Sequence, residues 1–235
     1  EMEKFGVFSD GAPLPYSGDR SILTVFEYLQ NTHGWTPDAE KPGGPVLALK
    51  RDGVSITLEP GGQLELSGAP HEDIHEVAKE LRAHMDELRP ISEKLGITWL
   101  GLGFHPFAKR EEMPWVPKSR YPVMRLYLPS RGSLGIDMMQ RTSTVQANFD
   151  FSSEARAMQM LLIGLKLAPL TTALFANSPI VEYRHVQGPS HRAKVWLETD
   201  PDRTGLVPAV WKRNAKFGDY VEWALDVPMF LFKRD

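Results

Sequence analysis

The sequence predicts an α+β protein built on an antiparallel sheet. Several short runs alternate apolar and polar residues, which is the pattern of half-buried strands, and turn residues join some of these runs into hairpins. Longer segments carry apolar residues every three or four positions and indicate helices. Strands and helices do not alternate regularly along the chain, as they would in a parallel sheet. The 235 residues are 42% hydrophobic and 24% charged, an ordinary composition for a globular protein.

The first half of the chain divides into short strands and two helices. Asp52 and Gly53 form a strong hairpin dipeptide, and Ser21 is a suitable cap for the helix that follows it. Pro90 should kink or split the longer helix, and residues 34–45 hold too many prolines and glycines for an element. The expected strands are residues 1–8, 46–50, 54–59 and 97–104, and the expected helices are residues 21–31 and 71–96.

The second half begins with a long loop over residues 105–121. Residues 144–151 alternate most cleanly in the whole chain and predict a strand. Ser153 should cap a helix that Pro169 divides in two. The expected helices are residues 121–128, 154–167, 169–176 and 218–225, and the expected extended segments are residues 192–199, 206–211 and 229–233.

Composition excludes several classes of function. The net charge of −3 provides no general basic surface for nucleic acid. No apolar run approaches the ~20 residues of a membrane helix, and residues 1–25 lack the pattern of a signal peptide, so we expect no membrane partner. The absence of cysteine excludes disulfides, thiolate metal sites and a cysteine nucleophile. Because this absence suits a reducing cytosol, a cytoplasmic protein is expected.

Residues 55–68 form the segment around which the chain is organised. Apolar and polar residues alternate on both sides of Pro60, Gly61 and Gly62, which predicts a hairpin with Glu59, Gln63 and Glu65 on one face. Two carboxylates on one sheet face repel each other unless a cation lies between them, and Mg²⁺ prefers carboxylate oxygen. The alternative is a solvated hairpin whose acids only keep an exposed face polar.

Other motifs carry weaker signals. Residues 71–75 match the H-E-x-x-H zinc pattern, but they lie at an expected helix start, where acids favour the helix dipole and no apolar shell surrounds them. Gly101 and Gly103 begin a dinucleotide-like motif that Pro106 breaks. The chain has no P-loop motif, so ATP would have to bind through another fold.

Residues 59–70 resemble the signature of glutamate–cysteine ligases of the plant and proteobacterial branch. Further matches follow in the order of that family at residues 1–6, 138–154, 174–179, 202–205 and 224–229. Met2 departs from the pattern, because the family normally has histidine there. The resemblance implies a glutamine-synthetase-like fold, in which helices pack on the outer face of a curved antiparallel sheet and the concave face binds ATP, metal and glutamate.

The resemblance implies an ATP-dependent ligase that joins the γ-carboxylate of glutamate to the amine of cysteine through a γ-glutamyl phosphate, the first step of glutathione biosynthesis. Its partners would be these small molecules. A related ligase with another amine acceptor and a noncatalytic nucleotide- or amino-acid-binding module are the alternatives. Because family members continue past Asp235, residues 1–235 are expected to be a single catalytic-domain fragment of a longer enzyme.

The resemblance also assigns candidate site residues. Phe230 stands where the family has a tyrosine that contacts cysteine, so the acceptor amino acid stays open. Arg120 and Arg192 would orient glutamate and act in catalysis, with Arg141 as a further catalytic candidate. The remaining candidates are Mg²⁺ ligands, namely Glu1, Glu3, Glu59 and Glu65, and nucleotide-site residues, namely Gln146, Asn148 and Arg203.

Overall fold

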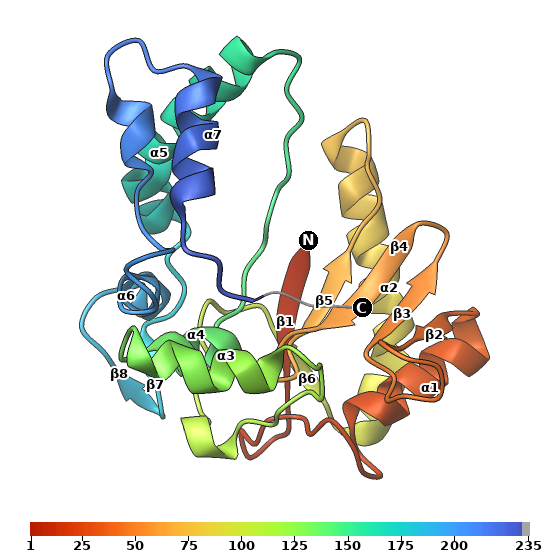
Figure 1. The fold of residues 1–235 in the computed structure, drawn as a ribbon. Coiled ribbons are helices and arrows are strands. Elements are labelled where there is room, and N and C mark those ends of the chain that lie inside the picture. Colours follow the sequence, from red (N-terminus) through yellow and green to blue (C-terminus); the bar gives the residue numbers. More distant parts are fainter. Residues whose placement is uncertain (232–235) are drawn as a thin grey trace.

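A computed structural model describes residues 1–231 (Figure 1). Within these residues the main sheet has six strands in the order β2-β3-β4-β5-β1-β6, and every neighbouring pair is antiparallel. The α+β class with an antiparallel sheet is therefore confirmed. The strands are β1 (Met2–Val7), β2 (Thr36–Asp38), β3 (Ala48–Arg51), β4 (Val54–Leu58), β5 (Leu64–Ser67) and β6 (Thr98–Leu100).

Two expected turns build the centre of this sheet. Asp52 and Gly53 both have positive φ, 49° and 81°, as a tight hairpin turn between β3 and β4 requires. Gly62, with a φ of 80°, closes the turn between β4 and β5. Each turn fixes the register of its strands, so the local sequence alone determines this part of the sheet.

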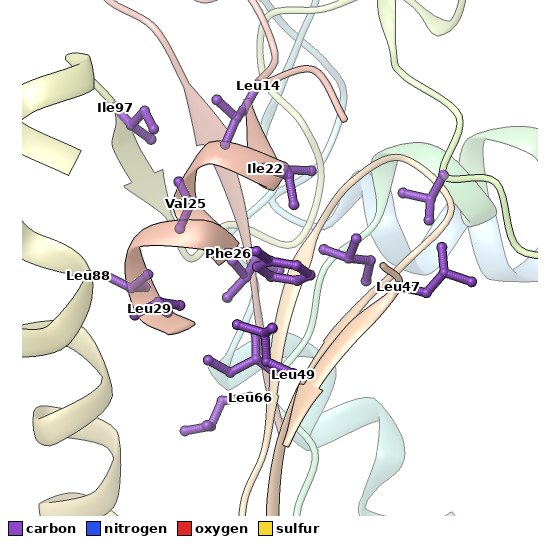
Figure 2. Close-up of a cluster of buried hydrophobic side chains, with 14 of the residues drawn as sticks. Leu14, Ile22, Val25, Phe26, Leu29, Leu47, Leu49, Leu66, Leu88 and Ile97 are labelled. Carbon is purple, nitrogen blue, oxygen red and sulfur yellow. The ribbon is translucent and has the colours of Figure 1, made fainter. Parts of the chain in front are cut away.

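Two helices cover one face of the sheet and form the main core with it (Figure 2). Helix α1 (Ile22–His33) is capped by Ser21, as expected, and presents Val25, Phe26 and Leu29 to the aliphatic residues of β3, β4 and β5. Helix α2 (Ile74–Leu95) packs beside α1 and adds Leu88. Because the large aliphatic residues of β3, β4 and β5 serve this core, Thr57 and Glu65 of the same strands are left on the opposite face.

Helix α2 corrects two expectations. It runs through Pro90 without a break, so the expected split is wrong. Its cap is Asp73, whose carboxylate accepts from the backbone N–H groups of His75 and Glu76. His71 therefore precedes the helix and cannot form the one-turn histidine pair of a zinc protease. The match to the H-E-x-x-H pattern is thus coincidental.

The remaining helices lie on the other side of β1 (Figure 1). Helices α5 and α7 stand side by side, away from the sheet, and an extended segment joins α4 to α5. The α-helices here are α3 (Tyr121–Tyr127), α4 (Gly135–Arg141), α5 (Glu154–Leu174), α6 (His191–Leu197) and α7 (Phe217–Asp226). Short elements complete the description: the 3-10 helices η1 (Arg110–Glu112), η2 (Leu128–Ser130) and η3 (Pro208–Trp211), and the hairpin β7 (Ile180–Val181) and β8 (Arg184–His185).

Several strand expectations in the second half are wrong. Residues 144–151 are extended, but only Val145 forms a bridge, to Met2, because no further strand lies beside the segment within the described residues. Residues 192–199 fall largely in helix α6 and residues 206–211 in η3. In the first half, residues 34–45 contain β2 and residues 97–104 contribute only β6. Residues 229–231 form no strand, and residues 232–233 lie outside the described part.

Helix α5 differs from the sequence expectation in two ways. Ser153 caps it as expected, but the helix continues through Pro169 instead of dividing there. By length and composition it is also the one helix within residues 1–231 that could cross a membrane, although one such helix is weak evidence. The sequence did not suggest it because Lys166 and Gly164 interrupt the apolar run. Four of its large apolar side chains are exposed, namely Ile163, Leu167, Leu170 and Leu174.

Candidate active site

A pair of glutamates lies at the centre of the polar sheet face. Strands β1 and β5 are antiparallel, and Glu3 is the direct partner of Glu65. Directly opposed residues project from the same face with Cβ atoms about 4.5–5.5 Å apart. On β4, at the other side of β5, the Thr57 hydroxyl donates to Oε2 of Glu65 at 2.5 Å, and on β5 itself the Ser67 hydroxyl donates to Oε1 at 3.2 Å. The Glu65 carboxylate is therefore held in place beside Glu3.

Glu59 joins this face from the end of β4. Its backbone N–H donates to the Gln63 carbonyl at 2.9 Å and so continues the ladder between β4 and β5. Alternation then places Glu59 on the side of Thr57 and Glu65, as the sequence predicts. Gln63 has a different role, because its buried amide donates to the carbonyls of Met139 and Thr142 and anchors the turn to the end of α4.

The three carboxylates form one electrostatic unit. Burial, together with the charges of Glu59 and Glu65, raises the pKa of Glu3 from 4.5 to about 7, against the opposing effects of the Thr144 N–H and the Arg192 charge. Burial also raises the pKa of Glu59, with the Glu65 and Glu1 charges acting in the same direction. Lys118 and Arg120 oppose that shift. The face therefore carries negative charge that the protein only partly compensates, which is the condition under which a bound cation is favourable.

The extended segment 143–148 forms the edge of this face. The Glu3 N–H donates to the Thr144 carbonyl at 2.9 Å, and the Thr144 N–H donates to Oε2 of Glu3 at 3.0 Å. The Gln146 N–H donates to the Glu1 carbonyl at 3.0 Å, and the Gln146 amide donates to Oδ1 of Asn148 at 2.9 Å. The structure therefore joins the backbone of Gln146 to Glu1 and the side chain of Gln146 to Asn148, although these residues do not lie on a regular strand.

Met2 and Lys4 lie on the opposite face of β1. Their partners are Leu66 and Leu64, whose side chains face the core. The departure from histidine at Met2 therefore does not remove a side chain from the carboxylate face. Lys4 is only 1% exposed, and its ammonium donates to the Leu64 carbonyl at 3.4 Å. Burial lowers its pKa from 10.5 to about 7, against an upward effect of Glu65.

Arg192 approaches the carboxylates from the start of helix α6. The Arg192 N–H donates to the Ser178 hydroxyl at 3.1 Å, and the Asn177 amide oxygen accepts from Gly103 N–H at 2.9 Å, which holds this corner together. Burial lowers the pKa of Arg192, and the nearby Glu3 charge raises it. Its Nε is buried and has no hydrogen-bond partner. The guanidinium is therefore a half-buried cation whose charge interacts with that of Glu3 and which has spare donor capacity.

A loop over residues 116–121 brings two more cations to Glu59. The Val116 N–H donates to the Pro60 carbonyl at 3.0 Å, and the Tyr121 hydroxyl donates to the Leu58 carbonyl at 3.2 Å. Arg120 was a sequence candidate, but Lys118 was not. The signal that could have indicated Lys118 is its spacing of two from Arg120 in a proline-bounded loop, which is weak without the tertiary contacts.

Comparison with known proteins identifies the family. The family model described as glutamate-cysteine ligase family 2 matches residues 1–235. The chain belongs to glutamate-cysteine ligase family 2. It is similar to chloroplastic glutamate–cysteine ligases, at 44% identity over 235 residues for Brassica juncea and 44% over 234 residues for Arabidopsis thaliana. These alignments cover 100% of this chain but only 45% and 44% of the two relatives, so the chain spans less than half of their length.

The relatives overturn one expectation. Glutamate–cysteine ligase B of Oryza sativa subsp. japonica, 43% identical over 236 residues, is also named chloroplastic, like the two relatives above. The expectation of a cytoplasmic protein was therefore wrong. It came from the absence of cysteine, which excludes disulfides but does not distinguish one reducing compartment from another.

Other sequence candidates occupy structural positions in this family 2 chain. Arg141 is buried, pairs with Asp137 at 3.0 Å and Glu182 at 3.2 Å, and stacks on Phe104. Arg110 pairs with the same aspartate. Two nitrogens of the Arg141 guanidinium are thus committed to carboxylates, while its buried Nε has no partner. Two ion pairs fit a residue that positions α4 better than one that contacts a substrate.

Arg203 and Phe230 form a separate cluster around Tyr127. Arg203 donates to the Tyr127 hydroxyl at 2.9 Å and to Asp200 at 2.8 Å. The Phe230 ring lies 4.7 Å from the Tyr127 ring, and Arg203 lies 5.4 Å from the Phe230 centroid. These contacts do not involve Glu3, Glu59 or Glu65. The structure therefore joins the predicted nucleotide residue Arg203 to the predicted acceptor residue Phe230.

The candidate metal ligands are neighbours but are not a closed cage. Within residues 1–231 no group of three or more histidine, cysteine, aspartate or glutamate side chains is positioned to hold a metal ion. The donor set is nonetheless made of oxygen only, and it is short of positive charge. This chemistry fits a hard cation such as Mg²⁺, which binds through one or two carboxylates and takes its other ligands from water and substrate phosphates.

Proposed function

We propose that the full-length protein containing this chain is an ATP-dependent glutamate–cysteine ligase. It would transfer the γ-phosphoryl group of ATP to the γ-carboxylate of glutamate, and the amine of cysteine would displace phosphate to form γ-glutamylcysteine, the first step of glutathione biosynthesis. The observation that carries the proposal is the cross-strand pair Glu3 and Glu65, with Glu59 and facing cations, in a chain of this family.

The carboxylate face would hold the metal and the nucleotide. Glu3, Glu59 and Glu65, with Glu1 at the edge, would ligate Mg²⁺, and Gln146 and Asn148 would contact the nucleotide or complete the metal shell. When bound, Mg²⁺ would neutralise phosphoryl charge and orient the reacting oxygens. The Thr57 and Ser67 hydroxyls would keep the Glu65 carboxylate in its orientation.

The cations would bind glutamate. Arg192 has an unused buried donor beside Glu3, and Arg120 lies over the Tyr121 ring near Glu59. A guanidinium fork matches a carboxylate in a bidentate manner, so the two arginines could fix the two ends of the substrate. Arg141 would act indirectly by positioning the end of α4, and Arg203 with Phe230 would form part of the nucleotide or acceptor region.

The α+β class with an antiparallel sheet includes several more specific folds. We infer that the sheet is the glutamine-synthetase-like type, with α1 and α2 on its outer face and substrates on the polar face. We also infer that residues 1–235 are a single catalytic-domain portion of a longer ligase, because the matched relatives are more than twice as long. Residues outside this chain would then contribute to the complete site.

A coupled assay of ADP release by the full-length protein tests the activity. Wild type is expected to release ADP when glutamate and cysteine are both present, and Glu65→Ala is expected to lose at least about 100-fold in kcat, as for the loss of a main electrostatic contact. Glu72→Gln, an exposed acid before α2, is the matched control and should retain activity.

The acceptor is varied in the same assay. A higher rate with another amine would indicate a related ligase, which the phenylalanine at position 230 makes worth testing. Metal-dependent ATP binding without any glutamate-dependent ADP release would contradict the ligase proposal and support a noncatalytic module.

A further inference from the structure

The loop over residues 116–121 is fixed to the sheet on both sides of Glu59. Its first residue, Val116, donates to the carbonyl of Pro60, and its last residue, Tyr121, donates through the hydroxyl to the carbonyl of Leu58. Pro60 and Leu58 are the two neighbours of Glu59 in the sequence. The loop therefore cannot shift relative to this carboxylate without breaking a tether on one side or the other.

Lys118 lies in this loop, and its charge interacts with those of Glu59 and Glu65. It is half-buried, its carbonyl accepts from Tyr121 N–H at 3.1 Å, and its Nζ lies 5.7 Å from the centroid of the Tyr121 ring. Tyr121 is only 2% exposed and packs in the main core. The charges of Glu59, Glu65 and Glu40 all stabilise the ammonium against the opposing effects of burial and Arg120.

The chemistry of lysine suggests what this ammonium binds. A guanidinium fork suits a planar carboxylate, whereas an ammonium is a compact charge with three donors that suits a tetrahedral phosphoryl group. Arg120 and Arg192 already provide forks near Glu59 and Glu3. The charges of Glu59 and Glu65, the two acids proposed to hold the metal, act on the Lys118 ammonium. A phosphoryl group bound to that metal would therefore lie in the field of the ammonium as well.

We propose that Lys118 is a further catalytic residue, whose ammonium contacts the phosphoryl group that passes from ATP to the glutamate γ-carboxylate; this inference rests on the proposed function. In the first step the bond between the γ-phosphorus and the bridging oxygen breaks, ADP leaves with the electron pair, and a γ-carboxylate oxygen bonds to phosphorus. In the second step the amine bonds to the acyl carbon, the bond from that carbon to the phosphate oxygen breaks, and the departing phosphate takes up the proton that the amine loses. Lys118 keeps its proton throughout and donates hydrogen bonds to the phosphoryl oxygens.

The test separates phosphoryl transfer from glutamate binding in the full-length protein. Lys118→Ala is expected to lower kcat for glutamate-dependent ADP release by about 100- to 1,000-fold, as removal of one transition-state donor does elsewhere. The Kd for glutamate, measured by calorimetry without nucleotide, should change by less than about threefold. Arg120→Ala should instead act mainly on substrate binding and raise the Kd for glutamate by about tenfold or more. Lys79→Ala, an exposed lysine on α2, is the matched control.

Two further variants distinguish a catalytic role of Lys118 from a purely structural one. Lys118→Met keeps the aliphatic stem over Tyr121, so its melting temperature shows whether the loop still folds. Lys118→Arg keeps the charge and should restore part of kcat. A kcat for Lys118→Ala within threefold of wild type would overturn the proposal. It would also fail if Lys118→Ala and Arg120→Ala raised the Kd for glutamate equally.

Wild-type activity distinguishes this inference from the proposed function. If wild type turns over and Lys118→Ala does too, only the role of Lys118 fails. If wild type binds Mg-ATP without any turnover, the ligase proposal fails. In that case a tenfold loss of Mg-ATP affinity in Lys118→Ala still supports a phosphate contact, and an unchanged affinity overturns it.

Discussion

Glu3 and Glu65 are direct cross-strand partners on β1 and β5, although they lie far apart in the sequence. Like charges directly opposite each other on a sheet destabilise it. The structure keeps this pair half-buried and adds Glu59 from the next turn. A fold that retains such a repulsive arrangement fits a site whose full charge balance is reached only with ligands bound.

Glu3 should make stability fall as pH rises. Because its pKa is raised to about 7 in the folded protein from an ordinary 4.5, the folded state binds more protons than the unfolded state between these values. The free energy of unfolding contributed by this group therefore decreases from about pH 4.5 to pH 7. Without divalent cations, Glu3→Gln should melt a few degrees above wild type at pH 8 and at the same temperature near pH 4.5. Added Mg²⁺ should reduce the difference at pH 8, and equal melting temperatures at all pH values would contradict the prediction.

Lys4 should have the opposite effect above pH 7. Its pKa is lowered to about 7 in the folded protein, so the unfolded state binds more protons between pH 7 and pH 10.5 and stability from this group rises over that range. Lys4→Met should therefore be more stable than wild type at pH 7, because it removes a buried charge, and the gain should shrink toward pH 10. Urea denaturation at several pH values measures this, with exposed Lys79→Met as the control. A gain that does not depend on pH would show that packing alone is responsible.

Arg192 should determine affinity for glutamate. Loss of a charge-assisted hydrogen bond costs about 1.5–3 kcal/mol, so Arg192→Ala should raise the Kd for glutamate by about 10- to 100-fold. The exposed Arg213→Ala is the control, and calorimetry on the full-length protein is the measurement. An unchanged affinity in a folded Arg192→Ala protein would remove this arginine from the substrate site.

Arg141 should matter mainly for stability. Removing one partner of a buried ion pair costs about 3–5 kcal/mol, and Arg110 still pairs with Asp137, so Arg141→Met should lower the free energy of unfolding by about 3 kcal/mol. Arg89→Met, which breaks an exposed pair with Asp86, should cost less than about 1 kcal/mol. Urea denaturation measures both. A stable Arg141→Met protein without activity would instead favour the catalytic role that the sequence first suggested.

The turns, the strand alternation and the helix caps of this protein could be predicted from residues close together in the chain. Turn residues and two-residue alternation fixed the hairpins of β3, β4 and β5, and the hydroxyl caps Ser21 and Ser153 fixed the starts of two helices. These features depend on residues only a few positions apart, so a single sequence contains all the information. The same alternation placed Glu59 and Glu65 on one face.

Only the tertiary structure decided what lies beside each local element. Residues 144–151 alternate like a strand, but a strand also needs a partner, and the described chain supplies only the bridge at Met2. Chain closure and packing set the remaining contacts of the site. They pair Glu3 with Glu65 and tether the loop of Lys118 on both sides of Glu59. They also bring Arg141 to Asp137 and Glu182. Such contacts depend on which surfaces are buried together, and the periodicity of a short segment does not record that.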